Sequence, residues 1–595
     1  MTHSKLLLRT VTLICLLCAL CALLVLVSCK PEEPTPTETD SAQETESTAP
    51  TTPAPDENGL ALVKNGASNF KLVRCYGTQA LRDGVTSIQL KVKQFTGVEL
   101  PIVDADEITE NDYCIVVGKN DDIPEIQTVL DQKGYGSYGF YYQNKKLMIL
   151  GATDTLNEKA LNKFLTALNA SLTKEKDMIL KMGSIESEFV HNAWLEDVPH
   201  PAVEIDDVID CNDSTFMLLK RGAQLSAYEA YIAQMEQSHY KLAQQNEING
   251  VRFATYQSEK GQVMVSYAPT THLLKIVCES FKTTTAIPNI APETGYTKLT
   301  ENKLSVMSLN YVASCTATDA AGLSLVLTLE DGRYIIIDGG YKADASGLYN
   351  YLVDNNKRSD GVTIAAWILT HSHNDHYSAF DSFANAYGKK VNCQYLISNT
   401  IPADYKPSKE SNDTKISDMS RYLSKFANKD AKFIKPHAGQ KLYFCNVELE
   451  MLYTHEELYP NKIAWMNEAS LAFHIKVGGQ KILVMGDAEL QAIDRMTTMY
   501  GSALKSDVLQ IPHHGYTKIQ QNFFDLVDAP VLIWPSNQET VNLRSSASWC
   551  SGLYKRLLEN CDVCYVADGT VEILTLPYTF GTQYETYTMD FSKRS

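Results

Sequence analysis

The sequence predicts an α/β protein whose largest domain lies at the C-terminal end. Short apolar runs typical of buried strands alternate with segments of helical periodicity between about residues 59 and 580. In the C-terminal half, four such runs each end in aspartate or histidine, as happens when one sheet edge gathers polar side chains from distant parts of a sequence. At 595 residues the chain is also too long for a single core. We therefore expect an α/β C-terminal domain preceded by two smaller domains of α/β and α+β type.

The first 58 residues have the composition of an export signal and a tether. Lys5 and Arg9 form a positive segment before an almost wholly apolar run, which ends in Ser28 and Cys29. This end resembles the bacterial lipobox, which implies cleavage after residue 28 and a lipid on Cys29; an uncleaved membrane helix is the alternative. Residues 29–58 are rich in Pro, Thr, Ser and Glu, which predicts an extended, disordered tether. We expect a protein anchored by lipid to a bacterial cell membrane, on its extracytoplasmic side.

Net charge and cysteine spacing argue against charge-driven binding to nucleic acid or membranes and against a redox function. The formal net charge is −18 and the pI about 5.2, which argues against broad, charge-driven binding to nucleic acid or to anionic membranes. The cysteines beyond Cys29 are scattered, and the single CxxC, Cys561 to Cys564, leads into a strand instead of opening a helix. Without a second pair it is a weak redox or zinc signal, and we expect buried thiols.

Residues 59–185 are predicted to form an α/β domain. Strands are expected at 60–63, 70–75 and 113–118, a hairpin over 138–150 that turns at Asn144-Lys145, and helices at 79–95 and 157–172. This order, with FTGVELPIVDADE, YCIVVGK and GFYYQNKKLMILGAT, resembles the accessory α/β domain that precedes the barrel in hexosaminidases and α-glucuronidases. No carboxylate pair here suggests glycosidase chemistry. The resemblance implies an accessory domain that lies against glycan.

Residues 190–290 are predicted to form a small α+β domain. Helical spacing runs from Ser226 to Gln244, and strands are expected at 251–256, 263–267 and 273–278. The Tyr and Met residues of the helix are expected in the core, because periodicity alone accounts for them. The sequence assigns this domain no function.

The C-terminal strands lead into polar motifs. A hairpin is expected at 325–329 and 334–337, followed by Asp338 and two glycines. Three further apolar runs, at 364–369, 481–485 and 508–511, lead into THSHNDH, GDA and PHHG. His371, His373, Asp375 and His376 thus fall within six residues directly after a strand, although the whole chain has only 13 histidines. Imidazoles and a carboxylate suit zinc or a similar divalent ion, so a metal site is favoured over a chance cluster of loop histidines.

Together these motifs resemble the metallo-β-lactamase superfamily. DGG, THSHNDHY, NEASLAFHIKVGGQKILVMGDAE and SDVLQIPHHG carry the likeness, which spans residues 300–580 and is greatest for the ComEC-like branch. It implies an αββα sandwich with the metal site along one edge of two packed sheets. Because every candidate ligand follows residue 300, we expect residues 300–590 to fold alone and retain metal.

The resemblance also implies a role for each site residue. It assigns His371 and His373 to one ion, Asp375 and His376 to a second, and Asp487 to a bridge between them. One histidine of the His513-His514 pair completes the set, and Asp338 supports it. The implied cofactors are two divalent ions, zinc or manganese, which polarise an ester and activate water. Asp375 and Asp487 are the candidate catalytic carboxylates, and either of the two is placed to move the proton.

Two departures from the family pattern leave questions open. Many members have a further histidine between the second and fourth motifs, where this chain offers His437, His455 and His474. His437 precedes an expected turn and His474 lies mid-strand, so whether His437 or His455 completes the first site is left open. Tyr516 follows HHG where relatives usually carry serine, which bears on contacts to the leaving group.

We expect a surface-anchored, dinuclear metal-dependent hydrolase of phosphodiester or related ester bonds in a large, cell-wall- or glycan-associated substrate. One alternative is hydrolysis of another ester, a lactone or a lactam. Another is a non-catalytic, glycan-binding surface protein with an idle hydrolase fold. The intact aspartates and histidines of all the motifs count against the idle fold.

Overall fold

The computed structural model describes residues 59–133, 136–181, 189, 193–211, 214–310, 320–402, 405, 407–410, 419–550, 552–569 and 571–580. The expected signal peptide, Cys29 and the tether lie outside these residues. All the described residues belong to one compact unit. Within the described part, no helix combines the length and apolar character needed to cross a membrane.

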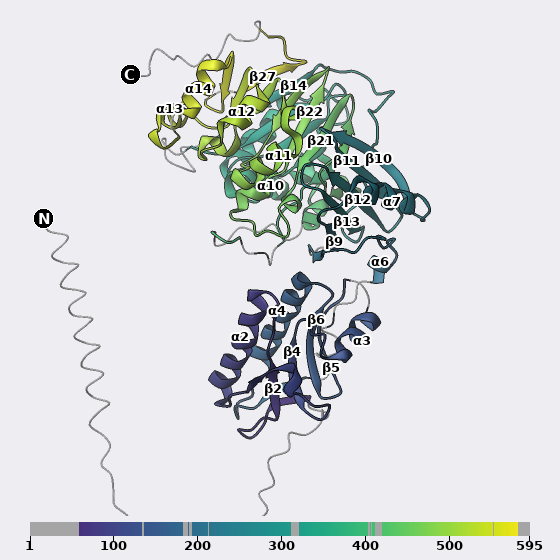
Figure 1. The fold of residues 1–595 in the computed structure, drawn as a ribbon. Helices are drawn as coiled ribbons and strands as arrows, with labels where there is room; N and C mark the ends of the chain where they lie inside the picture. The colour runs from purple at the N-terminus through teal and green to yellow at the C-terminus, as the bar shows by residue number, and fades with distance from the viewer. Residues whose placement is uncertain are drawn as a thin grey trace, which may run out of the picture. The chain divides into compact units, whose positions relative to one another are not determined.

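The first domain is built on a five-stranded sheet of order β3-β2-β4-β6-β5 (Figure 1). Its strands are β2 (Phe70–Val73), β3 (Ile102–Val103), β4 (Tyr113–Val117), β5 (Tyr138–Gln143) and β6 (Lys146–Gly151). Only β5 and β6 are antiparallel, and they join through Asn144 and Lys145, which both have positive φ angles as a tight hairpin turn requires. The predicted hairpin is therefore confirmed.

Three helices accompany this sheet: α2 (Gln79–Thr96), α3 (Pro124–Lys133) and α4 (Asp154–Ala170). Thr78 accepts a hydrogen bond from the backbone of Leu81 and Gly97 ends α2 in the left-handed conformation, so the helix has an ordinary cap at each end. A short pair, β1 (Leu60–Val63) with β7 (Met178–Leu180), joins the two ends of the domain. The two long predicted helices are confirmed, although α4 begins three residues earlier than expected.

The second domain contains a six-stranded antiparallel sheet of order β10-β11-β12-β13-β9-β8. The strands are β8 (Asp207–Asp210), β9 (Thr215–Lys220), β10 (Lys241–Ile248), β11 (Val251–Gln257), β12 (Gly261–Ala268) and β13 (Leu273–Ser280). The predicted helix over 226–244 is wrong in length, because α7 spans only Leu225–Glu236 and β10 follows. Asn249 and Gly250 both have positive φ and turn β10 into β11, so a hairpin signal outweighs the continued helical spacing. The helix side chains Tyr228, Tyr231 and Met235 are buried, as predicted.

Two seven-stranded sheets form the C-terminal domain. The first has the order β19-β18-β17-β16-β15-β14-β27, and the second β20-β21-β22-β23-β24-β25-β26. The first sheet comprises β14 (Asn302–Val306), β15 (Ser324–Thr328), β16 (Tyr334–Asp338), β17 (Thr363–Ile368), β18 (Asn392–Ile397), β19 (Lys432–Ile434) and β27 (Glu572–Leu576). The second comprises β20 (Lys441–Phe444), β21 (Val447–Tyr453), β22 (Ala472–Val477), β23 (Gln480–Val484), β24 (Val508–Gln510), β25 (Val531–Trp534) and β26 (Val563–Val566).

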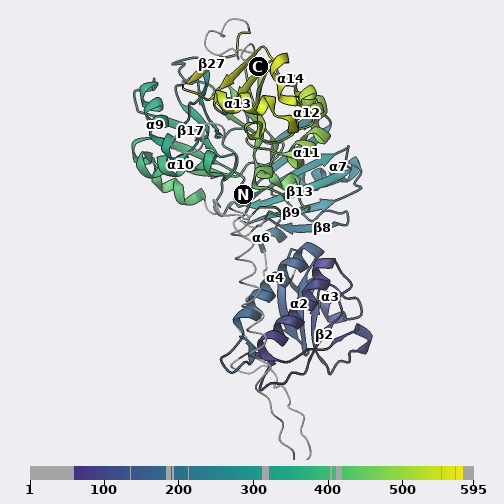
Figure 2. The same ribbon diagram turned by 90° about the vertical axis from the view of Figure 1, so that its left-hand side faces the viewer.

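The two sheets face one another and carry helices on their outer faces (Figure 2). One apolar core joins residues of both sheets, among them Ile336, Phe473 and Ile533. Helices α9 (Ala345–Asp354) and α10 (Asn374–Ala386) cover the first sheet, where Trp367 packs edge-on against two phenylalanines of α10. Helices α11 (Leu490–Tyr500), α12 (Gln521–Val527), α13 (Gln538–Ser546) and α14 (Leu553–Asn560) enclose a second core on the far side of the other sheet. The expected αββα sandwich is confirmed.

The sheet of the second domain packs against the edge of this sandwich. The side-chain amide of Gln244 donates to the carbonyl of Lys441 at 2.6 Å and accepts from its N–H at 3.0 Å, which satisfies the backbone of edge strand β20. Gly439 has a φ of +88°, and a Cβ there would lie 2.2 Å from Phe253. The two surfaces are therefore in close contact at β20 and β21.

The nine cysteines in the described part of the chain carry free thiols, and all but Cys561 are buried. Burial raises the pKa of Cys211 to about 12, which keeps this thiol protonated. Within these residues the expected buried thiols are confirmed.

Candidate metal centre

The centre begins at the end of β16, where Asp338 is fully buried with a φ of +56°. Its carboxylate accepts hydrogen bonds from the backbone N–H of Thr370 at 2.8 Å and from the Thr370 hydroxyl at 2.7 Å. Its backbone carbonyl accepts from the Trp367 indole at 3.0 Å. Because β16 and β17 are parallel, both strands end at the same sheet edge, and Asp338 fixes the loop that follows β17.

Helix α10 starts within the HxHxDH motif. His373 occupies the position before its first residue, and Asp375 and His376 lie in its first turn. His376 is fully buried, and its Nδ1 lies 2.7 Å from the Asp338 carboxylate. The helix start therefore directs His376 Nε2 and the Asp375 carboxylate towards the space between the two sheets.

Asp487 enters this space from the other sheet, directly after β23. Gly486 precedes it with a φ of +53°, and a Cβ at Gly486 would lie 2.9 Å from Thr370, so a larger residue would push the two loops apart. The backbone N–H of Asp487 donates to the Ser470 hydroxyl at 3.0 Å, and the side chain is only 2% exposed. The two sheets thus meet closely where their polar loops converge.

The HHG turn after β24 directs its two histidines differently. His513 and His514 both adopt left-handed backbone angles, a strained arrangement that costs roughly 1–3 kcal/mol per residue and is characteristic of functional sites. His514 is buried and faces Asp487. His513 is half-buried, and its Nδ1 lies 2.8 Å from the Thr517 hydroxyl and 3.0 Å from the Glu489 carboxylate. The structure therefore brings His514 to the centre and leaves His513 beside it.

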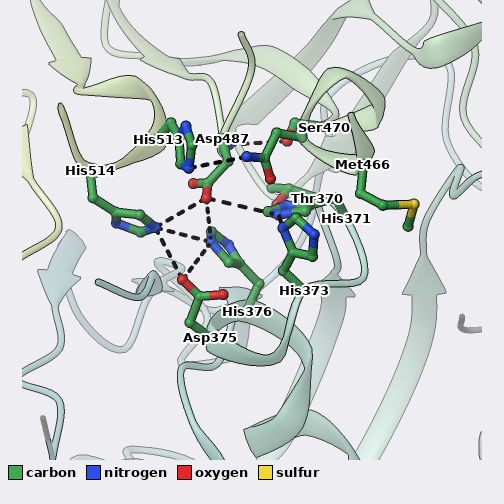
Figure 3. Close-up of polar contacts among 12 residues, drawn as sticks. Thr370, His371, His373, Asp375, His376, Met466, Ser470, Asp487, His513 and His514 are labelled. Carbon is green, nitrogen blue, oxygen red and sulfur yellow. Dashed lines mark hydrogen bonds and ion pairs between the residues drawn. The ribbon is translucent and has the colours of Figure 1, made fainter. Parts of the chain in front are cut away.

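Four donor atoms converge on one point (Figure 3). The Nε2 atoms of His376 and His514 lie 3.2 Å apart, and 3.1 and 3.2 Å from the Asp487 Oδ2. The Asp375 Oδ2 lies 3.4 Å from His514 and 3.7 Å from His376. Donors that each lie about 2.0–2.2 Å from a tetrahedral ion are separated by roughly 3.3–3.6 Å, which matches these distances. We call Asp375, His376, Asp487 and His514 the four-donor position.

His371 and His373 form a second group beside the first. His371 Nε2 lies 3.1 Å from His373 Nδ1 and 3.9 Å from the Asp487 Oδ2. His371 is buried and His373 half-buried, and both lie beside His376 (Figure 3). We call these two residues the two-histidine position.

Each of the four histidine rings at the centre has a polar partner at the ring nitrogen that faces away from the centre, and this contact orients the ring. The Asp338 carboxylate lies at His376 Nδ1, and the Pro535 carbonyl at His514 Nδ1, 2.8 Å away. The Thr370 hydroxyl lies 3.1 Å from His371 Nδ1, and Glu410 Oε1 lies 2.9 Å from His373 Nε2. Such outer contacts fix tautomer and orientation in metal-binding histidines. The Asp487 Oδ1 is buried without a hydrogen-bond partner, which a cation would supply. The donor set fits a divalent metal.

Comparison with known proteins agrees with this geometry. The family model of the metallo-beta-lactamase superfamily matches residues 317–420, which include Asp338 and the HxHxDH motif. The chain contains a metallo-β-lactamase superfamily domain. The fold and donor set of this domain are those of a metal-dependent hydrolase. No curated protein matches the chain.

Solved structures resemble this chain at low identity. The metallo-beta-lactamase fold protein YhfI from Bacillus subtilis is 14% identical, covers 46% of this chain and all of its own, and gives a TM-score of 0.29. Zn(2+)-bound PqqB from Methylobacterium extorquens is 12% identical, with 45% and 99% covered and a TM-score of 0.28. CmlA, a diiron beta-hydroxylase from Streptomyces venezuelae, is 10% identical, with 39% and 44% covered and a TM-score of 0.23.

The charges of the metallo-β-lactamase site are strongly coupled. Burial alone would raise the pKa of Asp487, but His376 and His514 hold it well below its ordinary value. Burial opposes protonation of His514, yet the charge of Asp487 and the hydrogen bond to Asp375 raise its pKa to about 9. The pKa of His371 is lowered well below its usual value, first by burial and then by the charge of His376. The imidazoles and carboxylates of the site thus attract one another strongly, and a bound cation would take the place of the protons on the imidazoles.

The other histidines between the second and fourth motifs are engaged elsewhere. His437 lies between two carboxylates, with Nδ1 2.7 Å from Glu456 and Nε2 2.9 Å from Glu279. His455 Nδ1 lies 3.1 Å from the carbonyl of Asn399, and burial lowers its pKa to about 4. His474 Nε2 lies 3.0 Å from the Ser506 hydroxyl. In the described structure none of the three joins the donors of the metal centre.

Several residues around the site escaped the sequence analysis. Glu410, which contacts His373, belongs to no motif and offered no signal in the sequence. Ser470 and Asn467 belong to the NEAS stretch, which the resemblance included without assigning roles. Asn467 Nδ2 lies 3.1 Å from His513 Nε2 and donates to Glu489 at 3.0 Å. Together Asn467, Glu489 and Thr517 occupy both nitrogens of His513.

Proposed function

We propose that this protein is a surface-anchored, dinuclear metal-dependent hydrolase that cleaves phosphodiester or related ester bonds. The observation that carries the proposal is the four-donor position, where two carboxylates and two imidazoles converge within 4.8 Å of one another. Two buried histidines and a buried aspartate that lie close together, with partners that orient the histidine rings, are expected of a working metal site and not of an idle fold.

The chain's own residues supply binding, orientation and proton transfer. When bound, two divalent ions would polarise the ester and lower the pKa of a water molecule. Asp487, which is 2% exposed, holds the centre together, since His376 and His514 both face its Oδ2. Asp375 reaches the open side with 18% of its side chain exposed, so its carboxylate can accept a proton from the attacking water and return it to solvent. Asp338 orients His376 throughout.

The substrate class rests on resemblance and on chain organisation. The HHG motif, as found in the ComEC-like branch, favours phosphoesters over lactams. The lipobox-like end at Cys29 and the tether to residue 58 favour a location outside the cell, held to the membrane by lipid. A domain that resembles glycosidase accessory domains favours a large substrate associated with the cell wall or with glycan. Zinc is the preferred ion for this N/O donor set, with manganese the next candidate.

A substrate panel tests the proposal. The full-length protein is loaded with Zn²⁺ or Mn²⁺ and assayed with bis(p-nitrophenyl) phosphate, p-nitrophenyl phosphate, p-nitrophenyl acetate, a chromogenic lactone and a chromogenic β-lactam. We expect metal-dependent release of nitrophenol from the diester, and none from the Asp487→Ala variant.

Each other result has a definite meaning. Faster hydrolysis of the acetate, lactone or lactam would replace phosphodiesters with that class. No hydrolysis of any substrate by fully metal-loaded protein would favour the non-catalytic surface protein, which a glycan-binding assay would then examine.

A further inference from the structure

The two metal positions differ in the donors that the chain supplies. The four-donor position offers two imidazole nitrogens and two carboxylates, which can fill a tetrahedral shell without any other molecule. The two-histidine position offers two imidazole nitrogens 3.1 Å apart, and the Oδ2 atom of the Asp487 carboxylate lies 3.9 Å from the Nε2 atom of His371. That oxygen already lies within 3.2 Å of both His376 and His514.

No further histidine in the described residues completes the two-histidine position. His437 has a carboxylate at each of its ring nitrogens, and His474 faces Ser506. His513 is the histidine nearest in sequence to His514, but Thr517 and Glu489 lie at its Nδ1 and Asn467 at its Nε2. Of the described histidines of this domain, His455 is the remaining one, and it is held at Nδ1 by the carbonyl of Asn399.

The two-histidine position is nevertheless arranged for an ion. His371 directs Nδ1 to the Thr370 hydroxyl, and His373 directs Nε2 to Glu410, so the two remaining nitrogens face one another. Glu410 is itself anchored, because its second oxygen accepts the backbone N–H of Met466 at 2.8 Å. A carboxylate held in this way orients a metal-binding imidazole and raises its basicity.

We infer that the two ions are bound unequally. The four-donor position binds one ion tightly, and the two-histidine position binds a second ion weakly, with Glu410 as the residue that positions His373. Because the described residues supply this second ion with few donors, its open coordination positions are the ones available to water and to a substrate oxygen. The inference rests on the proposed metal-dependent hydrolase, whose substrate-facing ion it identifies.

Electrostatics favour the same order. Asp375 and Asp487 together balance the charge of one dication at the four-donor position. A second dication at the two-histidine position shares Asp487 and is repelled by the first ion, with little screening because His371 and Asp487 are buried. The affinity of the second ion therefore depends on the contact between Glu410 and His373 more strongly than the affinity of the first ion depends on any one outer contact.

Metal titration of the full-length apo-protein tests the inference independently of activity. Zn²⁺ is titrated against a chromogenic chelator, and bound zinc is counted by elemental analysis after gel filtration. We expect two separate binding steps, and about one ion per chain retained after gel filtration. Circular dichroism at each step checks that every variant is folded.

Matched variants identify the two steps. His371→Gln with His373→Gln should remove the weak step and leave the tight one, whereas Asp375→Asn with His514→Gln should remove the tight one. Glu410→Gln should weaken only the weak step, by about 10- to 100-fold, the usual effect of losing an outer carboxylate. Glu489→Gln is the control, since this carboxylate lies beside His513, outside both positions, and should change neither step.

Two equal steps, or loss of the tight step on substitution of His371 and His373, would overturn the inference. A single step that survives substitution of both histidines, with no second step at millimolar zinc, would also overturn it. A weak step that Glu410→Gln leaves unchanged would remove the role of Glu410. Stepwise binding without hydrolysis of any substrate would instead count against the proposed function alone.

Discussion

Nε2 of His437, in the metallo-β-lactamase domain, lies 2.9 Å from the carboxylate of Glu279, at the end of the last strand of the preceding sheet. Both side chains are at most 2% exposed. Lys275 of the same strand pairs with Glu457, and Lys435 lies 3.0 Å from the Thr215 hydroxyl. Charged groups of the two domains are thus buried against one another, and removing one side leaves the other unpaired.

This contact changes the expected boundary of the folded unit. The sequence predicts that residues 300–590 fold alone, but such a fragment lacks the partners that β9 and β13 supply to His437, Glu457 and Lys435. We expect residues 300–580 to be largely insoluble or to unfold at a much lower temperature than residues 203–580, which retain the six-stranded sheet. Soluble yield, thermal unfolding and zinc content of the two fragments check this. Equal stability of both would show that the interface contributes little.

The His437 contacts also predict a pH dependence of stability. Burial would lower the pKa of His437, but the charge of Glu456 and the hydrogen bond to Glu279 raise it above 6.5. A raised folded-state pKa contributes stability that is fully present below about pH 6.5 and is lost as pH rises through the folded value. His437→Gln should therefore destabilise the protein most at acidic pH, by about 3–5 kcal/mol, as when one partner leaves a buried ion pair.

The measurement is denaturant unfolding of the chelator-treated protein at several pH values between 6 and 9. Chelation removes metal from both proteins, so the histidines of the metal centre contribute equally to the stability of wild type and variant and cancel in the difference. The stability difference between wild type and variant should narrow as pH rises. A difference that widens with pH would mean that His437 is neutral in the folded protein.

The sequence revealed most of the fold because local signals there agree. Asn144-Lys145 between two apolar runs specified a hairpin, and strands that end in Asp338, Asp487 and the HHG turn specified the sheet edge that holds the site. The sequence-based prediction failed where two signals compete. Helical spacing continues beyond Glu236, but the turn at Asn249 and Gly250 pairs the segment before it, β10, with β11 as a hairpin.

The outer contacts of the site could not be predicted from the sequence. Adjacent histidines such as His513 and His514 look alike in the sequence and both have left-handed backbone angles, so only tertiary contacts show that His514 faces Asp487 and His513 faces Glu489. Glu410 lies in an irregular segment, and only tertiary structure brings it to His373.

The HHG pair yields a direct comparison. His514→Gln should abolish zinc retention at the four-donor position, because the substituted amide provides a weaker donor beside Asp375 and Asp487. His513→Gln should retain the metal, since the contacts of His513 are to Glu489, Asn467 and Thr517. Elemental analysis of the two purified variants decides between them. Loss of metal in His513→Gln with retention in His514→Gln would reverse the assignment.

Cys29 lies outside the described residues, and its predicted lipidation can be tested separately. Cys29→Ala should release the protein from the membrane fraction without changing metal content, because the sequence predicts a tether between this residue and the folded domains. Fractionation and mass spectrometry of the mature N-terminus check this. Wild-type protein that keeps its first 28 residues and carries no lipid would make the segment an uncleaved helix.

Asp487 allows the most discriminating test of the whole site. Its Oδ2 faces His376 and His514 within 3.2 Å and His371 at 3.9 Å, and its Oδ1 is buried without a partner. A carboxylate so placed offsets repulsion between two dications and contacts both positions, so Asp487→Ala should reduce bound metal to well below one ion and abolish hydrolysis.

Two other substitutions in the same domain serve as comparisons for the loss of metal expected in Asp487→Ala. Asp338→Asn removes charge one contact further out, at His376 Nδ1, and should weaken metal binding by about 10- to 100-fold without abolishing it. His474→Ala removes a buried ring in mid-strand, so it should lower the unfolding temperature and leave metal content unchanged. Zinc content and thermal unfolding of all three variants give a rank order. If Asp487→Ala kept the zinc content of the wild type while His474→Ala lost it, the donor set would have to be reassigned around His474, because a bridging carboxylate cannot be dispensable to the ions that it joins.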